Sequence, residues 1–133
     1  MPKDLQNDIK LVELIPIQVI NTTTEGAAVD TYLPDGFKFP SALVKAGVGD
    51  LGSQASTKIK IQEDDDSGFG TSSTAEGGDE VTVSADSVYN FQIARKKRYL
   101  RAVVTFTTPG ATPSAEIHIS GILCDWGKPF PIL

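Results

Sequence analysis

Short runs in which apolar and polar residues alternate, separated by turns rich in Pro and Gly, constrain the fold of this chain more than any other feature. The run STKIKIQ at residues 56–62 places its isoleucines on one side and its lysines on the other. A side-chain period of two is typical of a β-strand with one buried face. No segment has a convincing amphipathic helical pattern, so the sequence predicts an all-β protein.

Two alternating runs near the C-terminal end have the clearest core pattern. Along Arg98–Phe106, the side expected to face the core carries Leu100, Ala102, Val104 and Phe106. Along Ala115–Cys124, the corresponding side carries Ile117, Ile119, Gly121 and Leu123. The intervening segment TTPGATPS (residues 107–114) has turn chemistry, so we expect the two strands to pair as a hairpin.

About eight short strands of this kind predict a single antiparallel β-sandwich or barrel. The chain has 133 residues, which fits one domain because domains usually contain ~100–200 residues. We expect a flexible N-terminal arm at residues 1–9, a β-sandwich domain at 10–124 and an extended C-terminal tail at 125–133.

The first predicted strand, Lys10–Ile20, contains Pro16. Proline cannot donate a hydrogen bond to a neighbouring strand, so this strand should lie at a sheet edge or be broken at that residue. A regular alternation would place Ile15, Ile17 and Val19 on one side.

Residues 63–80, EDDDSGFGTSSTAEGGDE, form a long acidic stretch without a core pattern. A loop of 18 residues is longer than most loops of compact domains, so it is either functional or disordered. The run Asp64–Asp66 offers oxygen ligands of the kind that Ca²⁺ prefers, but its spacing does not fit an EF-hand. A solvated acidic loop is the favoured interpretation, with an irregular divalent-ion site as the alternative.

Residues that could carry catalysis are few. The single histidine, His118, and the single cysteine, Cys124, lie in one predicted strand about 20 Å apart at ~3.3 Å per residue, too far for a Cys–His pair. One cysteine also excludes an intrachain disulfide and a cysteine-based zinc site. The glycines of GVGDLG at residues 47–52 fit a nucleotide-binding spacing, but a strand follows them, so we interpret them as loop glycines. We therefore predict no enzyme activity and no cofactor.

A compact basic cluster precedes the Leu100 strand. Five of the twelve basic residues fall within seven positions: Arg95, Lys96, Lys97, Arg98 and Arg101. The chain as a whole has a net charge of -5, which argues against direct binding to nucleic acid or to an anionic membrane.

Two interpretations of the basic cluster remain open. Segregated charge favours docking onto another protein or another copy of the chain. Alternatively, the lysines and arginines protect a solvated sheet edge against pairing. An acidic partner could be the stretch 63–80 of the same or of a neighbouring subunit.

The C-terminal tail DWGKPFPIL contains two aromatic residues, Trp126 and Phe130. Aromatic side chains are favoured interface anchors, so we interpret the tail as reaching a neighbouring subunit. The alternative is that it lies across its own sheet. The N-terminus lacks the apolar core of a signal peptide and no apolar run has the length of a membrane span, so we expect synthesis and folding in the cytoplasm of a host cell.

Several of these segments together resemble the capsid cement (decoration) proteins of tailed bacteriophages. The residues that carry the resemblance are KRYLR at 97–101, the following alternating strand, the turn 107–114 with the last strand, and IQEDDDSGF at 61–69. The resemblance covers residues 56–125, and the tail 125–133 departs from it.

The resemblance implies a jelly-roll domain that forms a homotrimer on the outer surface of an icosahedral virion. There it would clamp subunits of the phage major capsid protein against each other, without enzyme activity or cofactor. The alternatives are another structural role at the phage head–tail junction or tail, and a β-sandwich module that binds carbohydrate or Ca²⁺.

Overall fold

The computed structural model describes residues 9–34, 36–51, 57–106 and 114–124. Within these ranges there is no helix, which confirms the all-β class. The strands are β1 (Ile9–Ile20), β2 (Thr24–Glu25), β3 (Val29–Asp30), β4 (Ser41–Leu51), β5 (Thr57–Asp64), β6 (Ser73–Thr74), β7 (Val81–Thr82), β8 (Ser87–Ala94), β9 (Tyr99–Phe106) and β10 (Ala115–Cys124).

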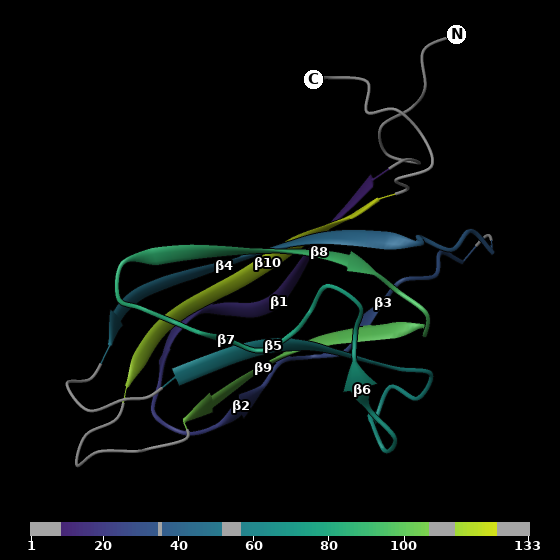
Figure 1. The fold of residues 1–133 in the computed structure, drawn as a ribbon. Helices are drawn as coiled ribbons and strands as arrows, with labels where there is room; N and C mark the ends of the chain where they lie inside the picture. The colour runs from purple at the N-terminus through teal and green to yellow at the C-terminus, as the bar shows by residue number, and fades with distance from the viewer. Residues whose placement is uncertain (1–8, 35, 52–56, 107–113, 125–133) are drawn as a thin grey trace, which may run out of the picture.

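These strands form two antiparallel sheets. Sheet A has the order β1-β10-β4-β8, and sheet B has the order β2-β9-β5-β6, with β3 also pairing with β9 and β7 with β5. Figure 1 shows the two sheets as two layers. Ten strands are described instead of the eight or so predicted, because four of them are two-residue pieces that pair with only two long strands, β9 and β5.

The hairpin predicted from the last two alternating runs is wrong in its pairing. β9 lies in sheet B and pairs with β5, whereas β10 lies in sheet A between β1 and β4. The alternation determines which side of each strand is buried, but it carries no information about the neighbouring strand. The connecting residues 107–113 lie outside the described ranges.

The core lies between the inner faces of the two sheets. Leu100, Ala102 and Val104 of β9 are buried as predicted, but Phe106 at the end of β9 is only partly buried. On β10, the predicted inward side is buried throughout. Cys124 is also buried, as a small apolar residue would be, although it belongs to the opposite side of the alternation.

β1 corrects the predicted alternation of the first strand. Ile15 is buried, whereas Ile17 and Val19 are 81% and 64% exposed. The register with β10 shifts between Glu13 and Ile15 and again between Ile15 and Gln18, and each extra residue moves the side chains that follow it to the other face. β1 is an edge strand of sheet A, so the edge position predicted from Pro16 is confirmed.

Three predicted boundaries also change. Ile9, assigned to the N-terminal arm, begins β1, and the rest of the arm lies outside the described residues. The acidic stretch 63–80 is not one long loop, because its first two residues end β5 and Ser73–Thr74 forms β6. The glycines at 47 and 49, predicted to lie in a loop, belong to β4, where they occupy positions facing away from the core.

Candidate interaction surfaces

The turn at residues 95–98 joins sheet A to sheet B at one end of the two layers, and acidic side chains of the same chain hold it. The Glu63 carboxylate accepts hydrogen bonds from the backbone N–H groups of Lys96 and Lys97, at 2.8 and 3.1 Å. The Asp65 carboxylate accepts one from the Arg98 N–H, at 3.1 Å. The acidic stretch therefore contacts the basic turn within one subunit, and a contact with the acidic stretch of a neighbouring subunit stays a prediction.

Three of the five basic residues form ion pairs within the chain: Lys96 has a long one with Glu76, and Arg98 and Arg101 have short ones. Arg98 donates from Nε and Nη2 to both carboxylate oxygens of Asp30, at 2.9 and 2.8 Å. Arg101 donates to Gln62 at 2.9 Å and pairs with Glu25 at 2.7 Å, with its guanidinium over the ring of Phe69. These side chains stabilise the ends of sheet B, and whether they also contact a partner stays a prediction.

The hydrogen bonds from Arg98 lower the pKa of Asp30 below its ordinary value of 3.8. Because this pKa is depressed, the pair stabilises the fold above pH 3.8 and loses that effect as the pH falls through the pKa of the folded protein. We expect Asp30→Asn to lower Tm by a few degrees at pH 7 and by less at pH 3, as measured by calorimetry. Asp50→Asn, an exposed carboxylate on β4, is the control, and an equal pH dependence in both variants would contradict this prediction.

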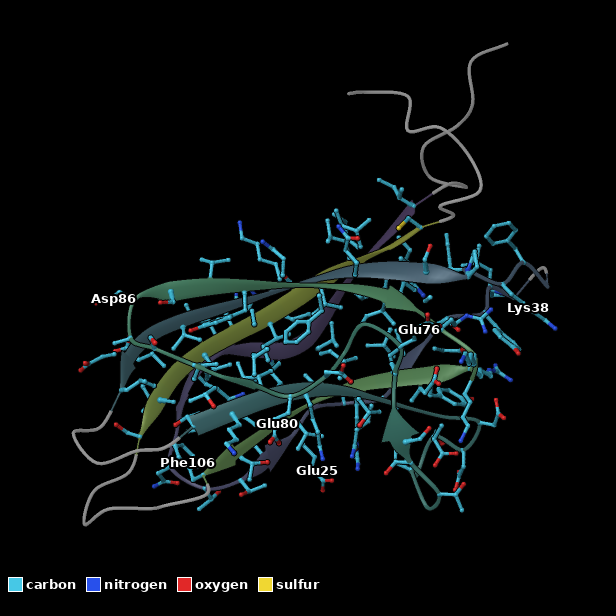
Figure 2. The ribbon with its side chains drawn as sticks, in the orientation of Figure 1. Glu25, Lys38, Glu76, Glu80, Asp86 and Phe106 are labelled. Carbon is cyan, nitrogen blue, oxygen red and sulfur yellow. The ribbon has the colours of Figure 1, made fainter. Side chains whose placement is uncertain are left out.

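Three cations surround the ring of Tyr32 beside the basic turn. The Lys38 ammonium and the Arg95 and Arg98 guanidinium groups lie 4.9, 5.2 and 4.7 Å from the ring centroid. Among the described residues, only Arg98 of these three has a carboxylate partner. Lys96 is highly exposed and has only a long contact with Glu76, 3.8 Å. This end of the molecule, marked by Lys38 in Figure 2, therefore exposes positive charge, and whether a partner binds there stays a prediction.

A second surface, the outer face of sheet A, was not predicted. It exposes large apolar side chains: Leu11 (75%), Ile17 (81%), Val19 (64%) and Val88 (54%). Leu43 and Ile122, both half-buried, lie opposite each other on β4 and β10 in the same face. The sequence signal that could have predicted this surface is an apolar residue on the polar side of an alternating run. Ile122 is the clearest case.

One end of this face is hollowed into a groove of about 470 Å³. Gly47 and Gly49 line the groove together with Ile17, Val19 and Val88. A Cβ atom added at Gly47 would meet only the backbone oxygen of His118, at 3.6 Å. The missing side chain of Gly47 therefore leaves room in the groove, whereas at Gly49 an added Cβ would lie 2.5 Å from the Glu116 carboxylate.

The residues considered for metal binding and catalysis, among them Asp64 and His118, contact other residues of the same chain. Asp64 accepts hydrogen bonds from the N–H groups of Asp66 and Thr71, at 3.0 and 2.8 Å, and these bonds lower its pKa. His118 lies on the outer face of sheet A beside Glu13, at 3.9 Å. Within residues 9–34, 36–51, 57–106 and 114–124, no group of three or more His, Cys, Asp or Glu side chains is arranged to hold a metal ion. Trp126 and Phe130, the predicted tail anchors, lie outside these ranges.

Comparison with known proteins gives no assignment. No protein-family model matches this chain, and no curated protein sequence is similar enough to count as a match. In the part of the chain that the structure describes, no helix is long and apolar enough to cross a membrane.

Proposed function

We propose that this chain is a non-enzymatic structural protein of a bacteriophage virion, which associates with itself and binds the major capsid protein on the outer surface of the head. The observation that carries this proposal is the apolar outer face of sheet A. Large exposed apolar patches bordered by polar residues mark interaction sites on soluble proteins. This face spans four strands, as expected of a protein that works in an assembly.

The strand order adds support. The chain crosses between the sheets from β1 to β2, β3 to β4, β4 to β5, β7 to β8, β8 to β9 and β9 to β10. With β2 and β3 taken as one broken strand and β6 and β7 as another, eight strands form two four-stranded sheets, which we interpret as a jelly roll. That architecture recurs in viral capsid proteins and in lectins. The resemblance at residues 56–125 favours the first of these classes.

Binding to capsid shells tests the proposal directly. The purified protein would be mixed with shells assembled from the major capsid protein encoded in the same genome and then sedimented. We expect the protein to sediment with the shells and to raise the temperature at which they rupture. Protein that remains in the supernatant at saturating concentration would overturn the proposal, as would specific binding to a glycan array or stabilisation by Ca²⁺ that EDTA reverses.

The basic turn supplies a prediction about the docking surface. Replacing Arg95, Lys96 and Lys97 together with glutamate should weaken shell binding about tenfold or more, which is ~1.4 kcal/mol. The loss of folding stability should be smaller, because Glu63 bonds to the backbone of Lys96 and Lys97 and not to their side chains. Co-sedimentation and urea unfolding measure the two effects.

The control for this charge reversal lies on β5, away from the turn. Lys58→Glu with Lys60→Glu also reverses positive charge, on the outer face of sheet B. This variant should retain shell binding. Equal losses of binding and of stability in the Arg95, Lys96 and Lys97 variant would show that the cluster only maintains the fold.

A further inference from the structure

The outer face of sheet A has a regular arrangement of side chains across its four strands. The strand register aligns one row from Leu11 through Ile122 and Leu43 to Gln92. The next outward row runs from Glu13 through Ser120 and Lys45 to Asn90. The third contains His118, Gly47 and Val88, and Ile17 lies beside it in the same groove. Two apolar bands are thus separated by one polar row.

We infer that a second copy of the chain covers this face, related to the first by a two-fold axis that runs along the strands between β4 and β10. A twisted sheet rotated by half a turn about a line along its central strands keeps its own shape. Two copies stacked about 10 Å apart, the usual spacing of packed sheets, therefore nest without a gap. The rotation brings β1 of one copy over β8 of the other, and β10 over β4.

The side chains that this rotation brings together are complementary. Ile122 faces Leu43 of the partner subunit, and Ile17 faces the partner subunit's Val88. His118 faces Gly47 of the partner subunit, where the missing side chain leaves room for the imidazole. Two of these pairs are apolar and the third places a small residue opposite a large one, as in packed sheet interfaces. The same rotation brings Leu11 over Gln92 of the partner subunit, which is a mixed pair.

The charges of the polar row also fit a second copy. Glu13 faces Asn90 of the partner subunit, and Lys45 faces the partner subunit's Ser120. Because Ser120 and Glu13 are opposite each other in β10 and β1, Lys45 of one copy also lies next to the partner's Glu13. No like charges of this row face each other, and two ion pairs form by symmetry.

The size of the face suits a stable dimer. Four strands at ~4.8 Å and about nine residues at ~3.4 Å give a footprint of about 20 Å by 30 Å. A standard interface buries ~800 Å² of accessible surface per partner. The accessible surface of the face exceeds its projected area, because side chains protrude from the sheet. This pairing rests on the self-association that is part of the proposed function. The dimer itself forms without any capsid. It also differs from the trimer that the family resemblance implies.

Sedimentation of the purified full chain tests the pairing without any shells. We expect a dimer at micromolar concentration. Leu43→Lys with Val88→Lys should weaken it about a hundredfold or more, because each change occurs twice in a two-fold interface. Thr82→Lys with Thr105→Lys, on sheet B, is the matched control and should leave the dimer intact. Circular dichroism and thermal unfolding of all variants establish that they fold.

Crosslinking tests the geometry. Ile17 and Val88 lie on opposite edges of sheet A, three strand spacings apart in one copy, or ~14 Å, but face each other across the axis. The double variant Ile17→Cys, Val88→Cys treated with a short bis-maleimide should give a covalent dimer, and each single variant should not. This reaction does not depend on the Lys substitutions being tolerated.

Three results would overturn the inference. The first is a wild-type chain that stays monomeric at a concentration of about 100 μM, since the expected dimer forms at micromolar concentration. The second is a trimer, whether or not the lysine variants disrupt it. The third is association that the lysine variants leave unchanged but that deletion of residues 125–133 abolishes, which would assign self-association to the tail. Shell binding by a monomeric protein would reject this pairing while leaving the proposed capsid role in place.

Discussion

Replacing Glu63 with alanine should lower the free energy of unfolding by about 3 kcal/mol, because it removes a charged acceptor and leaves two backbone donors without their partner. Glu63 is 3% exposed, and its Oε1 accepts from the N–H groups of Lys96 and Lys97. Both donors lie in the turn that connects the two sheets. Urea unfolding followed by circular dichroism measures the loss.

Two variants test whether the stability depends on the Glu63 carboxylate itself and not on any carboxylate of the acidic stretch. Glu63→Gln keeps a carbonyl oxygen for the turn and should lose only about half as much stability, since neutral hydrogen bonds are weaker than charge-assisted ones. Asp65→Ala removes one exposed bond to the Arg98 N–H and should cost less than about 1 kcal/mol. If Glu63→Ala were no more destabilising than Asp65→Ala, another group would have to hold the turn.

The Glu63→Ala variant should also affect the proposed binding to capsid shells. The side chains of Lys96 and Lys97 project from the turn, and the backbone N–H groups of both residues bond to this carboxylate, so the positions of these side chains depend on it. Loosening the turn should weaken shell binding even though no basic residue has been changed. The basic cluster and the acidic stretch then act as one unit, with the acidic side supplying the support and the basic side supplying the contact.

The fold class followed from local pattern, whereas the topology did not. β10 shows the limit clearly: its inward residues were correctly identified, but its neighbours are β1 and β4 instead of β9. Side-chain alternation depends on one strand and the core beneath it. Strand pairing depends on contacts between residues more than a hundred positions apart, such as Leu11 with Ile122.

The apolar face of sheet A was hidden for a related reason. Leu11, Leu43 and Ile122 come from three separate parts of the sequence, and each looks like an isolated exception to an alternating run. Only the register places them in one row. In β1 the register shifts also changed the expected faces, so Ile17 and Val19, which were expected on the same side as Ile15, are exposed whereas Ile15 is buried.

Replacing Gly77 with alanine should lower the free energy of unfolding by about 3 kcal/mol or rearrange the loop around it, since both strain and overlap contribute. Gly77 has a φ of 86°, in the left-handed region, and an added Cβ would lie 1.9 Å from the backbone oxygen of Gln92. The contact is with a backbone atom of β8, which cannot move away by adopting another rotamer as a side chain could. Thermal and urea unfolding measure the effect.

Gly36→Ala separates strain from overlap. Gly36 also has a positive φ, 95°, but an added Cβ would meet nothing within 4 Å, so this variant should cost only about 1 kcal/mol. The excess in Gly77→Ala then measures the contact with β8. Equal losses in the two variants would show that the loop moves away from β8 without cost.

The Gly77 loop has a further consequence for association, because it closes part of an open sheet edge. Beside Gly77, the Glu76 carbonyl accepts from the Ala94 N–H of β8 at 3.1 Å, and Ala75 and Gly78 both bond to Ile61 of β5 at 3.0 Å. The loop thus covers the end of the β8 edge and ties it to sheet B. Exposed edges invite pairing with other chains. Gly77→Ala should therefore add concentration-dependent aggregation through β8, which Leu43→Lys on the sheet face would not suppress, and light scattering of the double variant distinguishes the two surfaces.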